Sequence, residues 1–214
     1  MRSSHPIPGN PWPRGMTMTT DDRPTTVNEL LWVREAFDLT VAGDAPPPLL
    51  DSPAPASRSL TESERARWAA AWPDVWTAVV EHAARPHDAE AMDRLMRQDT
   101  PVEERPALLA RLAGPSWRDA FGDEVFDDPS HRAWDERSFA SIRSALPPNY
   151  EAQPERRAVD HLAAAWRRGL GKIIVLACEG TFVRSVGSSG LLVTTGDRDD
   201  NRSYREALAS FAPR

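Results

Sequence analysis

Histidine and carboxylate side chains come closest together between residues 81 and 90, and a metal site is the first chemistry that this spacing raises. The segment contains the ligand types that zinc accepts: Glu81, His82, His87, Asp88 and Glu90. A helical zinc motif needs two histidines four residues apart, because only then do both imidazoles face one ion. These histidines are five residues apart with a proline between them. We therefore expect a solvated helix end and loop, with no metal and no other cofactor.

The apolar run at residues 172–178 ends in Cys178, the only cysteine of the chain. A thiolate at a strand end is a competent nucleophile when a base lies beside it. The following residue is Glu179, however, and a neighbouring carboxylate raises the pKa of a thiol. We therefore predict a small, buried cysteine. A single cysteine also excludes an intramolecular disulfide and fits a reducing cytoplasm.

An enzyme or ligand-binding protein stays open as an alternative, with a site assembled from distant parts of the chain. Its first candidates are Cys178, Glu179, His161 and the acidic cluster Asp197–Asp200. The acidic cluster resembles a calcium loop, but an EF-hand needs Gly where Arg202 stands and Glu where Leu208 stands. Aspartates in such a run are typical of a helix N-terminus, where they bind open backbone N–H groups. We therefore assign no catalytic residue.

Three tryptophans stand four residues apart, at Trp68, Trp72 and Trp76. Helical spacing of this kind places the indoles along one face, either as part of the core or as a surface that a partner covers. Three alanines at 69–71 permit close helix packing and favour the core. Pro73 removes one backbone hydrogen bond, so we expect a kink or a break into two helices.

The candidate partner-binding residues are Trp72, Trp76 and Trp12. Because Pro73 separates the ladder into two parts, we expect at most one of its three indoles at the surface. Trp12 stands apart in a proline-rich N-terminal segment, from which it can dock on the body of the protein or on a partner.

The chain of 214 residues has a formal net charge of -6, which argues against a general attraction to nucleic acid or to anionic membranes. No apolar run approaches the ~20 residues that cross a bilayer. The first residues lack the apolar segment of a secretory signal. We therefore expect a cytoplasmic protein whose partner is another protein, with no nucleic acid and no membrane.

Hydrophobic periodicity predicts an α+β fold in which about six to eight helices dominate. The expected helices lie near residues 26–42, 60–84, 89–96, 100–113, 128–146, 154–168 and 200–211. A small C-terminal antiparallel β-meander is expected from strands near residues 172–178, 181–186 and 191–195, followed by the closing helix. The strand at 172–178 is almost entirely apolar, so helices 154–168 and 200–211 are the candidates to cover it.

The predicted domain organisation has three parts. Residues 1–24 are rich in Pro, Gly, Thr and Asp and are expected to form a disordered tail. Residues 25–214 are expected to form a single globular domain. Within it, the proline-rich connector at 44–59 cannot be helical, and it either floats or wraps the surface in extended form.

The leading functional hypothesis is a soluble, non-enzymatic interaction protein: an adaptor, a regulator or a toxin-neutralising, immunity-like partner. It follows from the acidic charge, from eight tryptophans and from the lack of a catalytic motif. A structural subunit of a larger assembly is a further alternative to the enzyme. The sequence leaves the oligomeric state open.

Overall fold

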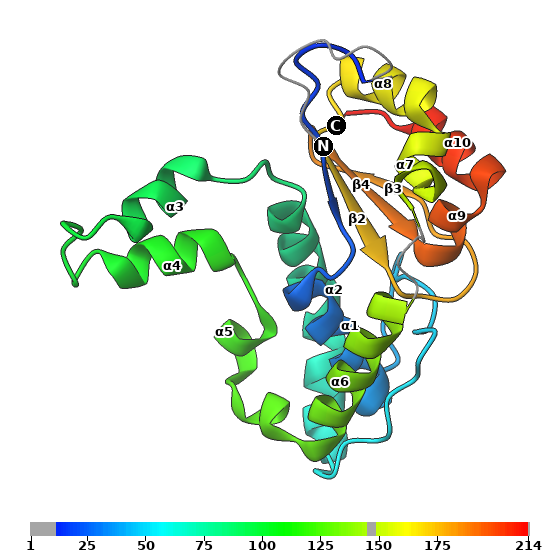
Figure 1. Ribbon diagram of the computed structural model, residues 1–214. Helices are drawn as coiled ribbons and strands as arrows, with labels where there is room; N and C mark the ends of the chain where they lie inside the picture. Colours follow the sequence, from blue (N-terminus) through cyan, green and yellow to red (C-terminus); the bar gives the residue numbers. More distant parts are fainter. Residues whose placement is uncertain (1–11, 145–148, 214) are drawn as a thin grey trace.

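A four-stranded sheet separates two groups of helices in the computed structural model, which describes residues 12–144 and 149–213 (Figure 1). The fold is α+β and mostly helical, as predicted. The strands are β1 (Thr19–Asp21), β2 (Lys172–Leu176), β3 (Arg184–Val186) and β4 (Gly190–Thr194). The helices are α1 (Thr25–Ala36), α2 (Glu62–Ala83), α3 (Ala89–Met96), α4 (Arg105–Ala113), α5 (Trp117–Phe121), α6 (Pro129–Ser144), α7 (Pro154–Arg157), α8 (Val159–Arg167), α9 (Thr195–Asp199) and the closing helix α10 (Asn201–Ser210). The predicted end of the sixth helix, at residue 146, lies outside the described residues.

The strand order is β1-β2-β4-β3, which differs from the expected meander. β4 lies between β2 and β3, pairing parallel with β2 and antiparallel with β3. A hairpin does not follow β2, because the chain there pairs with the proline-rich connector instead. Leu49 forms an antiparallel bridge with Cys178, and the Glu179 N–H donates to the Pro48 carbonyl at 2.8 Å.

Residues 12–24 belong to the folded structure, which corrects the prediction of a disordered tail for this part of it. β1 pairs parallel with β2, from Thr19 opposite Lys172 to Asp21 opposite Ile174. Met16 and Met18 are both buried. They stand two residues apart, and in an extended segment this spacing places both side chains on the same face. The three-residue strand is too short for a sequence pattern to reveal. Residues 1–11 lie outside the described part, and the single domain at 25–214 stays a prediction.

Each face of the sheet contributes alternate side chains to a different hydrophobic cluster. Ile174, Leu176 and Leu192 pack with residues of α1 and α2. Ile173, Val175, Leu191 and Val193 pack with residues of α8 and α10. The expected cover by helices 154–168 and 200–211 is therefore confirmed for one face of the sheet, while α1 and α2 cover the other (Figure 1).

The tryptophan ladder lies in the cluster on the α1–α2 face. Trp68, Trp72 and Trp76 are only 2%, 1% and 2% exposed, so no ladder indole is left at the surface. The Trp72 indole N–H donates to the Leu30 carbonyl at 2.9 Å, and its ring stacks on Trp76 with centroids 5.2 Å apart. α2 continues through Pro73 as one helix, so the predicted break into two helices does not occur. Its N-terminus carries the capping box that Thr61 and Glu64 form.

The proline-rich connector wraps the body of the protein. The Arg34 guanidinium on α1 donates to the Pro47 carbonyl at 2.8 Å, and the neighbouring Glu35 carboxylate accepts from the Leu49 N–H at 2.7 Å. An extended, proline-rich segment has no hydrogen bonds of its own to satisfy its backbone. The Arg34–Glu35 pair therefore supplies partners that fix its path.

Replacing Trp72 by alanine tests the role of the ladder in the core. The Trp72→Ala variant should lose about 3–5 kcal/mol of unfolding free energy, because it leaves a cavity and removes the indole hydrogen bond to the Leu30 carbonyl. Urea denaturation followed by circular dichroism measures this loss. Met96→Ala, at a side chain that is 74% exposed, is the control and should change the unfolding free energy by less than about 0.5 kcal/mol. Equal effects of both variants would contradict the assignment of Trp72 to the core.

Candidate functional site

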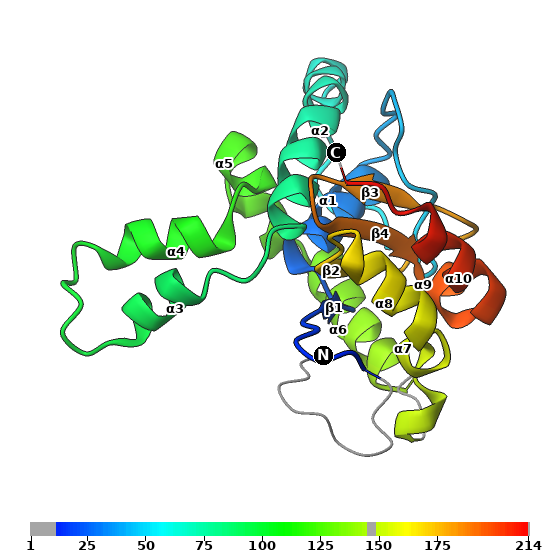
Figure 2. The same cartoon turned by 90° about the horizontal axis from the view of Figure 1, so that it is seen from above.

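Helices α3 and α4 form an arm, residues 87–114, that projects away from the sheet and the other helices (Figures 1 and 2). The two helices lie side by side and are joined by the tip at residues 97–104. Within α4 no residue is buried, and within α3 only Ala91 is buried. The arm therefore has little hydrophobic core of its own, and most of its surface is open to solvent.

The arm carries most of the large exposed hydrophobic side chains of the described chain. Met96 at the end of α3 is 74% exposed, Val102 in the tip 78%, and Leu109 on α4 53%. Among the described residues, the other two are Leu50 and Phe139, each on a different part of the body. Single exposed apolar residues are ordinary, but three on one projecting element are typical of a surface that another molecule covers.

Ion pairs tie the two helices of the arm together. Arg94 lies 2.9 Å from Glu104, and Arg111 lies 2.6 Å from Asp88. Exposed pairs of this kind are screened by solvent and add little to stability, so they set the arrangement of the two helices more than the stability. The six carboxylates of the arm outnumber its four guanidinium groups, which leaves its surface acidic.

Asp88 fixes the base of the arm in two ways. One carboxylate oxygen accepts from the Ala91 N–H at 2.9 Å and caps α3, while the other binds Arg111 near the end of α4. The backbone hydrogen bond from Ala91 is the main reason that the pKa of Asp88 is lowered, with Arg111 adding to it. The carboxylate is therefore ionised at neutral pH and engaged on both sides.

His82 and Gly114 hold the arm against the end of α2. The His82 ring Nε2 donates to the Leu112 carbonyl at 3.2 Å. Gly114 has φ of 72° and lies so close to this ring that a Cβ atom would meet His82 Cδ2 at 2.2 Å. Only glycine combines this left-handed backbone with this close approach.

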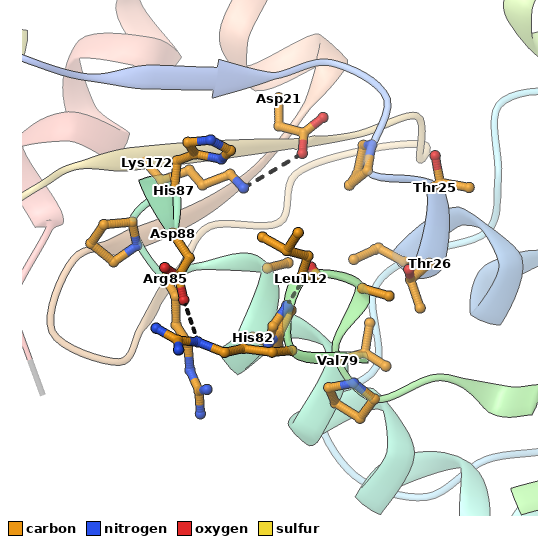
Figure 3. Close-up of a pocket in the computed structure, with 17 residues that line it drawn as sticks. Asp21, Thr25, Thr26, Val79, His82, Arg85, His87, Asp88, Leu112 and Lys172 are labelled. Atoms are coloured by element: carbon orange, nitrogen blue, oxygen red, sulfur yellow. Dashed lines mark hydrogen bonds and ion pairs between the residues drawn. The ribbon is translucent and has the colours of Figure 1, made fainter. Parts of the chain in front are cut away.

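A cavity of about 290 Å³ lies at the base of the arm (Figure 3). Its walls come from the ends of β1 and α2, the starts of α1 and β2, and the end of α4. The ionisable residues that line it are Asp21, His82, Arg85, His87, Asp88, Arg111 and Lys172. Residues of the segment at 81–90 thus line a cavity, but their side chains are not arranged as zinc ligands. Among the described residues, no group of three His, Cys, Asp or Glu side chains is placed to hold a metal ion.

The structure does not support the predicted partner-binding residues Trp72 and Trp76, because both are buried in the core. Trp12 is partly buried and packs against the cluster on the α8–α10 face, so it docks on the body of the protein. The residues that form the exposed surface lie in the ranges predicted as helices, 89–96 and 100–113, but they were not singled out as a site from the sequence. The sequence signal for an exposed arm is its dense charge, together with four prolines around its two short helices.

The candidates for an assembled enzyme site lie on both sides of the sheet. Cys178 is buried in the cluster on the α1–α2 face, whereas His161 lies on α8, which packs on the opposite face. The Asp197 carboxylate accepts from the Phe182 N–H and the Thr194 hydroxyl, at 2.9 and 2.8 Å. Asp200 caps α10 by accepting from the Ser203 N–H, as the acidic run predicted. These aspartates therefore have structural partners.

Comparisons with protein-family models, with curated proteins and with solved structures found no match for this chain. In addition, no helix of the described chain has both the length and the apolar character that crossing a bilayer requires. The arm and the cavity at its base are therefore the features on which a functional proposal has to depend.

Burial raises the pKa of the Cys178 thiol to about 12. At neutral pH its thiolate fraction should be about a thousandfold lower than that of an unfolded cysteine, so alkylation by iodoacetamide should be correspondingly slow. Mass spectrometry over time measures the rate in native buffer and in urea. A double variant, Cys178→Ser with Ser59→Cys, supplies an exposed thiol as the control. Fast alkylation of native Cys178 would restore the thiol mechanism.

Gly114→Ala tests how the arm is attached. The variant should be destabilised by more than the ~1–2 kcal/mol of left-handed strain, because the new methyl group must also displace His82 from the Leu112 carbonyl. Gly122→Ala is a matched control, since Gly122 also has positive φ (82°) but only a Glu124 oxygen, at 3.9 Å, near its Cβ position. Denaturation curves give the stabilities, and hydrogen exchange of α4 amides reports the attachment. Equal losses and unchanged α4 exchange would show that His82 does not hold the arm.

Proposed function

We propose that this chain is a non-enzymatic interaction protein of the cytoplasm that binds another protein through the α3–α4 arm. The observation that carries the proposal is the exposure of Met96, Val102 and Leu109 on one projecting element. A partner that covers these side chains removes apolar surface from water, which is the main driving force of association.

The shape of the arm supports a particular binding mode. Two short antiparallel helices that extend from a body present their side chains to a groove, as amphipathic helices do in many protein complexes. The ion pairs Arg94–Glu104 and Arg111–Asp88 hold the hairpin in one arrangement before binding. Such preorganisation reduces the conformational entropy that binding has to overcome.

The charge of the arm supports a basic partner. Three of its carboxylates, at Glu90, Asp93 and Glu103, belong to none of its ion pairs between Arg94 and Glu104, Arg97 and Asp99, or Arg111 and Asp88. With a net charge of -6 on the whole chain, the arm attracts a cationic surface from a distance. Among the possible roles, this favours a regulator or neutralising partner of a basic protein over a structural subunit.

The test replaces the exposed apolar side chains of the arm together. Full-length protein with Met96→Ser, Val102→Ser and Leu109→Ser should keep its circular dichroism spectrum, because these residues are exposed, but should bind its partner at least about tenfold more weakly. A photo-crosslinking amino acid at position 102 identifies the partner by mass spectrometry, and binding is then measured with the purified pair.

The matched control is Leu50→Ser with Phe139→Ser, which removes the exposed apolar residues of the body. This control should bind like the unaltered protein, and higher salt should slow association of the unaltered protein. The proposal is wrong if the arm variant binds the crosslinked partner with unchanged affinity, or if the body variant alone loses binding.

A further inference from the structure

The imidazole of His131, in the first turn of α6, lies among three aromatic rings. The Trp32 ring of α1 meets it edge-on, with centroids 4.8 Å apart. The Phe126 ring, from the short 3₁₀ helix before α6 (Glu124–Asp127), lies 5.2 Å away, and the Trp134 ring of α6 lies 6.3 Å away. All three aromatic side chains are buried, so the imidazole is partly removed from water.

These surroundings favour the neutral form of the imidazole. His131 Nδ1 lies 3.2 Å from the Phe126 carbonyl, which only accepts hydrogen bonds, so Nδ1 carries the proton of the neutral ring. A second proton, on Nε2, would place a positive charge among apolar rings, where it loses solvation. It would also place this charge at the N-terminus of a 16-residue helix, where the helix dipole disfavours a cation.

The charged groups that face His131 do not offset this cost. They are Glu29 of α1, Arg118 of α5 and Asp135 of α6, and the 3₁₀ helix contacts the ring through Phe126. Glu29 lies 2.6 Å from the Arg118 guanidinium, and Asp135 lies 2.6 Å from that of Arg23. Both carboxylates that would favour an imidazolium are therefore already paired. Burial has the largest effect, and the pKa of His131 is lowered from its ordinary value.

The same end of α6 holds the proline-rich connector. The Trp134 indole N–H donates to the Asp51 carbonyl at 2.7 Å. Just before the helix, the Asp128 carboxylate accepts from the Ser57 N–H at 2.8 Å and from the Ser57 hydroxyl at 2.5 Å. Burial raises the pKa of Asp128, but the hydrogen bonds from Ser57 and Ser130 together outweigh burial and lower it. Asp128 therefore stays ionised in mild acid, so His131 is the group that responds there.

We propose that His131 is a pH-sensitive switch: its neutral ring holds the start of α6 against α1, and its protonation frees the connector segment 51–57 from α6. A ring that leaves the aromatic side chains regains an ordinary pKa of about 6.5, whereas the enclosed ring binds a proton only at lower pH. The closed arrangement is therefore fully favoured above this pH and is lost as the pH falls through it. From pH 7.5 to pH 5.0 the open population should rise by up to about thirtyfold.

The first experiment is an NMR pH titration of the unaltered full-length protein. The His131 Hε1 resonance should titrate below about pH 6.5. Hydrogen exchange of the Trp134 indole N–H, corrected for the intrinsic rate at each pH, should report about tenfold or more opening at pH 5.0 relative to pH 7.5. An ordinary pKa for His131, or equal protection of the indole at both pH values, would overturn the proposal.

A matched pair of histidine variants assigns the response to one side chain. His131→Gln cannot titrate, so opening at the Trp134 indole should change by less than about twofold between the two pH values. His161→Gln on α8 is the control and should keep the full response. The switch is contradicted if His131→Gln keeps the response or if His161→Gln abolishes it. Should His131→Gln fail to fold, the titration of the unaltered protein decides. Neither variant lies on the arm, so the outcome is independent of the proposed function.

Discussion

The pair of parallel strands β2 and β4 is buried on both faces, and the arrangement of the rest of the chain depends on this constraint. Alternate residues of β2, such as Ile173 and Ile174, face opposite clusters, so the sheet needs two separate layers of cover. The helices on the two sides come from distant parts of the sequence. β1 then pairs with the free edge of β2, which brings the N-terminal segment into the sheet. The ends of β1 and β2 in turn form one wall of the cavity below the arm.

Local signals in the sequence were reliable where the determining interactions are local. The capping box of Thr61 and Glu64 marks the start of α2, and the apolar run from Lys172 marks β2. The order of the strands could not be read in this way, because it depends on contacts between remote segments. Leu49 of the connector occupies the position beside Cys178 that a hairpin would otherwise fill. The hydrophobic pattern of the connector and that of the segment after β2 do not indicate that the two segments pair.

The candidate site was harder to predict than the fold, because exposure is a tertiary property. Trp72 and Met96 both stand on apolar positions of predicted helices, and only the packing of the whole chain separates them. The Trp72 indole finds the Leu30 carbonyl and the ring of Trp76, whereas Met96 lies at the end of α3, on the projecting arm. Large aromatic side chains contribute the most burial energy, so they occupy the core, whereas the smaller apolar residues Met96, Val102 and Leu109 stay exposed on the arm.

The arm and the body are joined by few interactions, and this has a consequence for function. His82 at the end of α2 binds the Leu112 carbonyl of the arm, and Gly114 allows the chain to return close to α2. A segment with so little buried surface belongs to the least stable part of a fold, so its arrangement responds to small changes in free energy. The cavity lies at this joint, between Arg111 of the arm and Lys172 of the body.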